Sequence, residues 1–171
     1  AASIGDIVNT HMNVYGTLEN LADKVAIHIT DTHPTLAIPE LMRILLDDCG
    51  YGWDEAWNIV TNTVAYTNHT VMAEALECWP EDLFKRLLPR IYEITKEIDN
   101  RFRSYVWNAT GDADKVERMA IVSNGVIRMA NMSVAGSHCV NGVSQLHSEI
   151  LKNSLFNDYY RLTPEKFTNV T

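Results

Sequence analysis

The apolar positions in the first half of the chain follow a strand–helix–strand order. Segment 24–30 is β-branched and nearly continuously apolar, which is typical of a strand covered on both faces. Residues 38–50 form a helical pattern with an apolar stripe, framed by a proline near its start and a glycine at its end. A second helical pattern starts near Asp54, and the β-type segment 64–68 follows it.

The remaining pattern predicts more helix and one further strand. Residues 3–14 form a short amphipathic helix, and the longest helix covers roughly 80–107. Pro89 falls inside that helix and predicts a kink or a break. Segment 126–134 follows a turn and reads as an extended run, after which helical spacing resumes over 140–150.

Three extended runs that are each followed by a helix predict an α/β fold with a parallel sheet and right-handed crossovers. Ligands bind to such sheets outside the carboxyl ends of the strands. Polar clusters lie at the three expected ends, in segments 30–34, 66–70 and 135–138. The sequence therefore predicts that these three clusters share one rim.

Composition limits the classes of function. The chain has 171 residues, 46% of them hydrophobic, which suits one folded domain. With 22 acidic and 14 basic residues its net charge is −8, so neither nucleic acid nor an anionic membrane is an expected partner. No apolar run is long enough to predict a membrane span. Three widely spaced cysteines indicate reduced thiols in a cytoplasmic protein.

Asp31, His33 and His69 are the candidate chemical groups at the first two strand ends. Asp31 and His33 alternate on an extended segment, so both side chains point to one side. They could bind a metal, act as an acid–base pair or hydrogen-bond a polyol; alternatively Asp31 caps the next helix. His69 could serve a sugar hydroxyl or a reacting oxygen, or belong to a simple turn. A metal site built from all three lacks a supporting local motif such as HExxH.

The third cluster could use small residues and backbone amides to hold an anion, but close packing of strand, turn and helix is the favoured explanation. The chain has no G-x-G-x-x-G, Walker A or G-x-S-x-G motif. His147 lies within the last helical pattern and is expected to be structural.

Long stretches of the sequence resemble the α-glucan phosphorylases, which include glycogen, starch and maltodextrin phosphorylases. They are "KVAIHITDTHPTLAIPELMRILLDD", "WDEAW", "AYTNHTVMAEALECWPEDLFKRLLPR" and "VAGSHCVNGVSQLHSEILK". The resemblance is dense from about residue 24 to 171. Because several long motifs occur in the same order, it is far more specific than any single pair of residues.

The resemblance implies a two-domain enzyme of the GT-B type, with two Rossmann-like domains facing across a cleft. Such enzymes transfer a terminal glucosyl unit of an α-1,4-glucan to inorganic phosphate and release α-D-glucose 1-phosphate. Their pyridoxal 5′-phosphate is bound to a lysine of the C-terminal domain, and they are commonly homodimers. Residues 1–171 resemble a single partial domain, the three-layer core of the N-terminal half. This piece is therefore expected to hold no cofactor and to be inactive without the C-terminal domain.

The resemblance also assigns roles to individual residues. His69 resembles the histidine that contacts the transferred glucose, and Asp31 and His33 resemble residues that line the approach of the glucan. Further predicted substrate contacts are Thr70, Glu74, Val134 and Ala135. Thr30 replaces the usual asparagine and Ala73 replaces the usual proline, so the loop that carries Glu74 departs from the family pattern. The rival interpretations are a non-catalytic carbohydrate-binding domain and a metal-dependent hydrolase using Asp31, His33 and His69.

Overall fold

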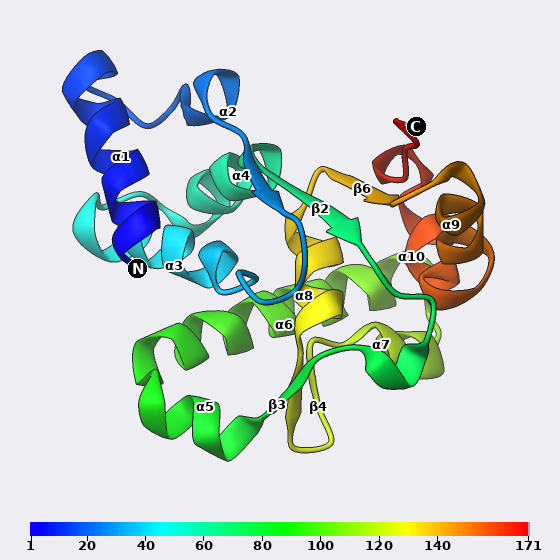
Figure 1. The fold of residues 1–171 in the computed structure, drawn as a ribbon. Helices are drawn as coiled ribbons and strands as arrows, with labels where there is room; N and C mark the ends of the chain where they lie inside the picture. Colours follow the sequence, from blue (N-terminus) through cyan, green and yellow to red (C-terminus); the bar gives the residue numbers. More distant parts are fainter. Residues whose placement is uncertain (171) are drawn as a thin grey trace.

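Three parallel strands form the central sheet of the computed structural model, which describes residues 1–170 (Figure 1). These strands are β1 (Ile27–Ile29), β2 (Val64–Asn68) and β6 (Cys139–Gly142), in the order β1-β2-β6. A second, antiparallel sheet has the order β3-β5-β4, from Cys78–Pro80, Val126–Arg128 and Val122–Ser123. The predicted parallel sheet with flanking helices is confirmed.

Helices make up most of the remaining structure. The α-helices are α1 (Ala2–Tyr15), α2 (Leu21–Lys24), α3 (Ala37–Arg43), α4 (Trp53–Thr63), α5 (Glu81–Leu87), α6 (Pro89–Thr110), α7 (Ala113–Met119), α8 (Met129–Gly136), α9 (Gln145–Ile150) and α10 (Asn157–Leu162). Short π-helical or 3-10 segments are η1 (Ile44–Asp48), η2 (Ala73–Ala75), η3 (Leu151–Leu155) and η4 (Pro164–Lys166).

Local signals in the sequence predicted the positions of several of these elements correctly. The predicted strand 64–68 is observed, and the first predicted strand is present in shorter form. The long helix is broken as expected, because α5 ends before Leu88 and α6 starts at Pro89, which has no amide hydrogen to donate. Asn124 and Gly125 both have positive φ, 52° and 74°, in the turn that joins β4 to β5.

The third predicted strand is wrong. Only Val126–Arg128 of segment 126–134 is extended, and it pairs antiparallel in the second sheet. The residues that follow form α8, which packs against β2 and leads into β6. The true third parallel strand, Cys139–Gly142, lies where a helix was expected. All eight residues of α8 are buried, Asn131 and Ser133 included, so the run has no exposed polar face that would reveal a helix.

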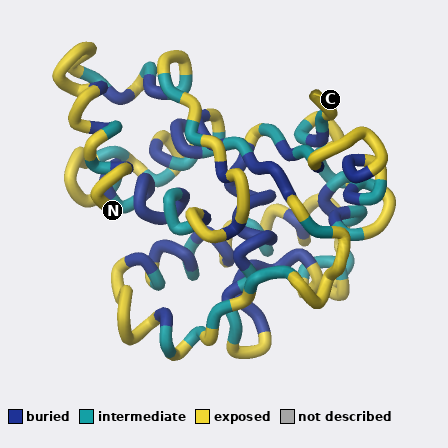
Figure 2. Tube along the Cα trace, in the orientation of Figure 1, coloured by how far each residue is buried: buried dark blue, intermediate teal, exposed yellow. Residues whose placement is uncertain are grey.

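Helices cover one face of the central sheet. Ile29, Tyr66 and Val140 form a buried row across its three strands on this face. On the opposite face, the His28 imidazole donates to the Thr67 hydroxyl at 2.7 Å, and Thr67 donates to Asn141 at 2.7 Å. Figure 2 shows the buried trace along β2 and α8, in contrast to the exposed loop after β1. The sheet thus holds its polar loops against a rigid core.

Candidate functional site

The loops after β1 and β2 leave the sheet at the same edge. Ile29 lies beside Tyr66 in the parallel register, so Asp31 and His33 follow one strand where His69 follows its neighbour. All three of these polar side chains are exposed. The prediction that the first two polar clusters share the carboxyl edge is therefore confirmed. We call the loops at this edge, residues 30–35, 69–77 and 143–147, the carboxyl rim.

Glu77 is the centre of the hydrogen-bonded part of the rim. The Thr32 hydroxyl donates to one carboxylate oxygen of Glu77 at 2.5 Å, and the Trp79 indole donates to the other at 2.9 Å. His33 lies with one ring nitrogen 3.6 Å from Glu77 and the other 3.6 Å from Asp31. The His33 side chain is 79% exposed, so these contacts add little stability and leave it free to bind a ligand.

Sequence reasoning missed Glu77, because Thr32, which joins it to the β1 loop, lies 45 positions earlier in the chain. The turn of η2 brings it back towards the β1 loop. The predicted contact residue Glu74 lies within this turn and is exposed. No local pattern distinguishes these two glutamates, so only the fold could separate them.

Asn68 orients the loop that carries His69. Its side-chain amide donates to the Tyr66 hydroxyl at 3.0 Å, and its carbonyl oxygen accepts from the Thr70 amide at 2.9 Å. Burial raises the pKa of Tyr66 to about 12, and the charges of Asp31 and Glu77 add to that effect. The Tyr66 hydroxyl therefore stays protonated near neutral pH, beneath the polar rim.

His147 joins the third rim loop to the second. Its Nδ1 accepts from the Val143 amide at 3.2 Å, so the proton of the neutral ring is on Nε2. Nε2 then donates to the Thr70 carbonyl at 3.2 Å. Val143 itself is 50% exposed beyond the end of β6. Sequence reasoning missed this loop; the signal was Ser144, whose hydroxyl caps α9 by accepting from the His147 amide.

Val134 and Ala135 do not lie on the carboxyl rim. Both are buried in α8, with exposed fractions of 0% and 4%. The chain reaches the opposite edge after them, since the His138 amide donates to the carbonyl of Val64, the first residue of β2. The expectation that the third cluster joins the other two was wrong, because it depended on the misplaced strand.

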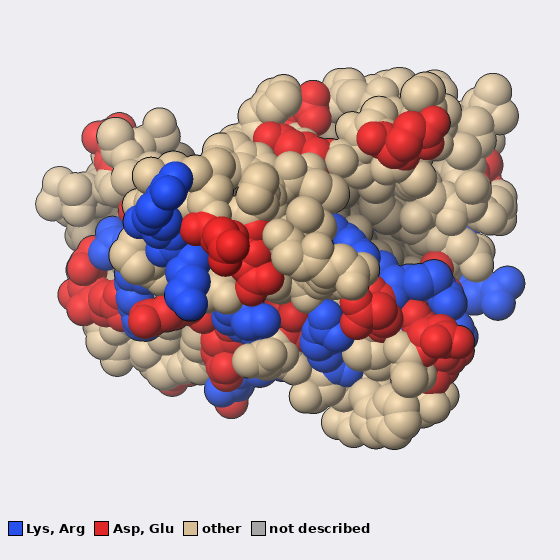
Figure 3. All heavy atoms as spheres, turned by 90° about the horizontal axis from the view of Figure 1, so that it is seen from below, with Lys and Arg blue, Asp and Glu red and all other residues tan. Residues whose placement is uncertain are grey.

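Metal-binding clusters, surface charge and membrane-spanning helices each limit the kinds of site that the described residues could form. Within residues 1–170, no group of three or more His, Cys, Asp or Glu side chains is arranged to hold a metal ion. Figure 3 shows basic and acidic side chains intermixed on the face seen from below. Opposite charges also pair at the surface of the protein, as Arg90 does with Asp47 at 2.7 Å. None of the helices in the described part of the chain is both long and apolar enough to cross a membrane.

Comparisons with known proteins point to a single family. The family model described as carbohydrate phosphorylase matches residues 1–171. The chain is 50% identical over 171 residues to glycogen phosphorylase of Bacillus subtilis (strain 168), which covers 99% of the chain and 21% of that relative. It is 56% identical over 153 residues to the cytosolic α-glucan phosphorylase 2 of Arabidopsis thaliana, covering 86% of the chain and 18% of that relative.

The human muscle form of glycogen phosphorylase is 54% identical over 153 residues, covering 87% of the chain and 18% of that relative. The chain therefore spans about a fifth of the length of the curated relatives it matches.

Proposed function

The chain belongs to the carbohydrate phosphorylase family, and on that premise we propose that it is part of an α-glucan phosphorylase. The longer protein transfers the terminal glucosyl unit of an α-1,4-glucan to inorganic phosphate. The glycosidic bond breaks, a bond from the sugar to phosphate forms, and the products are α-D-glucose 1-phosphate and a glucan shortened by one unit. The names of the relatives support this reaction, and neither rival interpretation gains support from them.

The observation that carries the proposal is the shared edge of the β1 and β2 loops. It presents the carboxylates of Asp31 and Glu77, the imidazoles of His33 and His69, and main-chain groups around Thr70. A glucan is a polyol, and carboxylates and imidazoles are suitable hydrogen-bond partners for its hydroxyls. We infer that this rim is the wall against which the glucan lies.

Within this wall, His69 is the residue that we assign to the transferred glucosyl unit. Its ring hydrogen-bonds a sugar hydroxyl, and its main-chain carbonyl faces the positive charge that develops on the sugar ring. Asn68 and His147 hold the Thr70 backbone on either side and so keep this loop in place. Asp31 and His33 contact the incoming glucan, and Thr70 and Glu74 contact sugars on the acceptor side.

The family also implies pyridoxal 5′-phosphate, which supplies proton transfer through its phosphate group when bound. The carboxyl rim contains no lysine to hold that cofactor. Lys166 lies near the opposite edge, where its ammonium group donates to the Val134 and Ala135 carbonyls. We therefore place the cofactor lysine in a part of the longer protein outside this chain. We also place the longer protein in the cytoplasm, as a homodimer whose C-terminal domain faces the rim.

Replacement of His69 in the longer protein tests the assignment. His69→Ala should lower kcat/KM for phosphorolysis of maltodextrin about tenfold to a hundredfold, because a charge-assisted hydrogen bond is worth about 1.5–3 kcal/mol. His138→Ala is the matched control, since His138 is also exposed but lies at the other edge of the sheet. Equal kinetics for the wild type and the His69→Ala variant would refute the role of His69.

A further inference from the structure

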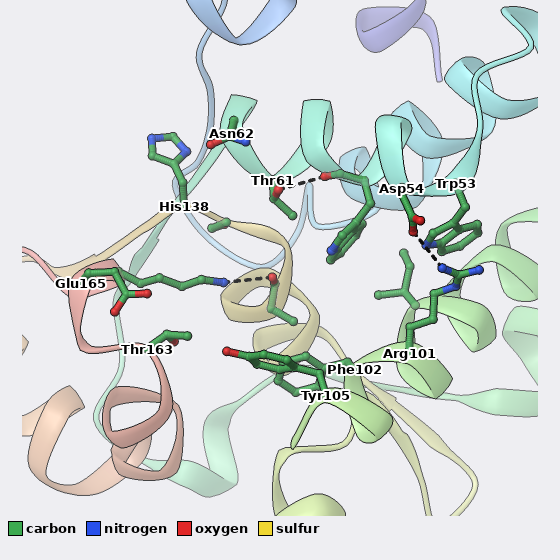
Figure 4. Close-up of a pocket in the computed structure, with 15 residues that line it drawn as sticks. Trp53, Asp54, Thr61, Asn62, Arg101, Phe102, Tyr105, His138, Thr163 and Glu165 are labelled. Carbon is green, nitrogen blue, oxygen red and sulfur yellow. Dashed lines mark hydrogen bonds and ion pairs between the residues drawn. The ribbon is translucent and has the colours of Figure 1, made fainter. Parts of the chain in front are cut away.

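Lys166 lines a cavity of about 540 Å³ at the amino edge of the sheet, away from the carboxyl rim. The cavity is formed by α4, α6 and the chain around η4, and its volume is within the range of about 300–1,000 Å³ that is usual for small-molecule sites. Figure 4 shows polar side chains of α4 above it and aromatic side chains of α6 below it. Thr61 precedes β2 and His138 precedes β6, so the cavity lies at the strand ends opposite to His69.

Two main-chain carbonyls orient the side-chain nitrogen of Lys166. Nζ lies 3.3 Å from the Val134 carbonyl oxygen and 3.2 Å from that of Ala135, both near the end of α8. A neutral amine has two hydrogens, which these carbonyls accept, so its lone pair is directed away from them. Burial lowers the pKa of this group to about 8, although the charge of Glu165 opposes the effect. Lys166 is therefore an oriented nucleophile at slightly alkaline pH.

A buried hydroxyl without a partner lines the same cavity. Ser137 is 0% exposed, and within residues 1–170 its hydroxyl has no hydrogen-bond partner. It follows Ala135 by two positions, so it lies beside the end of α8 that Lys166 contacts. An unpaired buried hydroxyl is unfavourable, and a ligand atom that accepts its hydrogen would remove that cost. The cavity thus combines a nucleophile with a free hydrogen-bond donor.

Aromatic side chains of α4 and α6 form the apolar wall of the cavity. Phe102 stacks on Tyr159 with ring centroids 5.7 Å apart, and its centroid lies 6.3 Å from that of Tyr105. The Arg101 guanidinium lies 4.9 Å from the centre of the Trp53 ring. These contacts hold the rings in place before a ligand arrives. A flat apolar group can therefore pack against the wall with little loss of side-chain freedom.

We propose that Lys166 is a modification site that takes up an aromatic acyl group from a thioester. The unprotonated Nζ attacks the acyl carbon, and the Ser137 hydroxyl donates to the oxygen on which negative charge develops. The carbon–sulfur bond breaks, and the sulfur leaves as a thiol with one proton of the nitrogen. The product is an amide whose ring lies against the aromatic wall.

The two carbonyls at the end of α8 favour an acyl group over an aldehyde. The amide nitrogen keeps one hydrogen, which still donates to one of these carbonyls. A neutral imine nitrogen has no hydrogen, so an aldehyde would leave both carbonyls without the lysine as donor. The proposed modification uses no residue of the carboxyl rim and is independent of the proposed reaction.

Incubation of the longer protein with S-benzoyl-N-acetylcysteamine at pH 8, followed by peptide mass spectrometry, tests the proposal. Lys166 should be benzoylated about tenfold faster than the exposed Lys24, because more of its amine is unprotonated. Lys24 in the same sample is the matched control. Ser137→Ala should slow the reaction at Lys166 about twofold to tenfold, the worth of one neutral hydrogen bond, and leave Lys24 unchanged. Circular dichroism checks that the variant is folded.

Three results would overturn the assignment. Benzoylation of Lys166 no faster than that of Lys24 would show that the cavity does not activate the amine. An unchanged rate at Lys166 in Ser137→Ala would show that the acyl oxygen does not lie at this hydroxyl. The preference for Lys166 over Lys24 should be smaller with S-acetyl-N-acetylcysteamine, and an equal preference would show that the aromatic wall does not hold the acyl group. Phosphorolysis is measured separately, so failure here leaves the proposed reaction intact.

Discussion

Polar side chains play different roles at the two edges of the central sheet. At the carboxyl edge, Glu77 and His147 connect loops that come from different strands, and the side chains beyond them are exposed. At the amino edge, Ser137 and Lys166 line a cavity whose walls also include aromatic side chains of α4 and α6. The carboxyl edge is thus held by polar contacts between loops, and the amino edge by helix packing together with the hydrogen bonds of Lys166 to the end of α8.

Replacement of Gly142 at the carboxyl edge and of Gly136 at the amino edge provides the strongest test of this difference. A Cβ on Gly142 would lie 2.8 Å from the His147 ring and 2.9 Å from the Ser148 main-chain nitrogen. Because backbone cannot move aside, Gly142→Ala should lower the free energy of unfolding by about 3 kcal/mol. A Cβ on Gly136 would lie 2.7 Å from Cδ1 and 3.0 Å from Cγ2 of the buried Ile38 side chain, which can adjust more than a backbone atom can.

Gly136→Ala should therefore cost about 1 kcal/mol, partly offset by the better helix propensity of alanine. Urea denaturation of both variants measures the two losses. Equal losses would show that the loop contacts at the carboxyl edge are no tighter than the helix packing at the amino edge.

The sequence predicted local features of this architecture and missed those that depend on distant contacts. The strand ending in Asn68 and the break at Pro89 were found because each has its own residue signal. β6 was missed because Val140, Val143, Leu146 and Ile150 imitate helical spacing, although only Val140 belongs to the strand. The third parallel strand was predicted at 126–134 instead, and this error displaced the third polar cluster to the wrong edge.

Some residues of the carboxyl rim were predicted from the sequence and others were not. Asp31, His33 and His69 stood out because titratable side chains directly follow strands. Glu77 and His147 could not be recognised, since their structural roles depend on hydrogen bonds to Thr32 and Thr70 on other loops. The roles of all these residues in substrate binding remain predictions.

His147 gives the next largest expected effect. His147→Leu removes both hydrogen bonds of a buried ring and leaves the Val143 amide and the Thr70 carbonyl unpaired, which should cost about 2 kcal/mol. His138→Leu at the amino edge should change stability by less than about 0.5 kcal/mol, because His138 is exposed. Amide exchange at Val143 should quicken in the first variant alone. Unchanged exchange there would show that His147 does not hold the rim together.

Lys166 should make the amino edge sensitive to pH. Burial lowers the pKa of its ammonium group to about 8, from 10.5 when exposed. Between these values the unfolded chain binds more protons than the folded chain, so the free energy of unfolding rises with pH. We expect a rise of about 1–2 kcal/mol from pH 8 to 9.5, below the range where tyrosines ionise.

Lys166→Met should abolish this rise, and Lys24→Met, at an exposed position, should keep it. Urea denaturation at a series of pH values measures both slopes. A slope that persists in Lys166→Met would assign the proton to another group.

The smallest expected effects come from two buried serines, Ser148 near the carboxyl edge and Ser137 near the amino edge. Replacement by alanine should lower stability at Ser148 and leave it unchanged or raise it at Ser137. Ser148 accepts from the Gly142 amide at 3.0 Å and donates to the Ser144 carbonyl at 2.9 Å, so Ser148→Ala should cost about 1 kcal/mol. Within residues 1–170, the buried Ser137 hydroxyl has no hydrogen-bond partner. Ser137→Ala should therefore be neutral or stabilise the fold by up to about 1 kcal/mol, because the desolvation cost of an unpaired hydroxyl disappears. Thermal denaturation of the two variants side by side measures the difference, and a clear loss of stability in Ser137→Ala would show that this hydroxyl is hydrogen-bonded in solution.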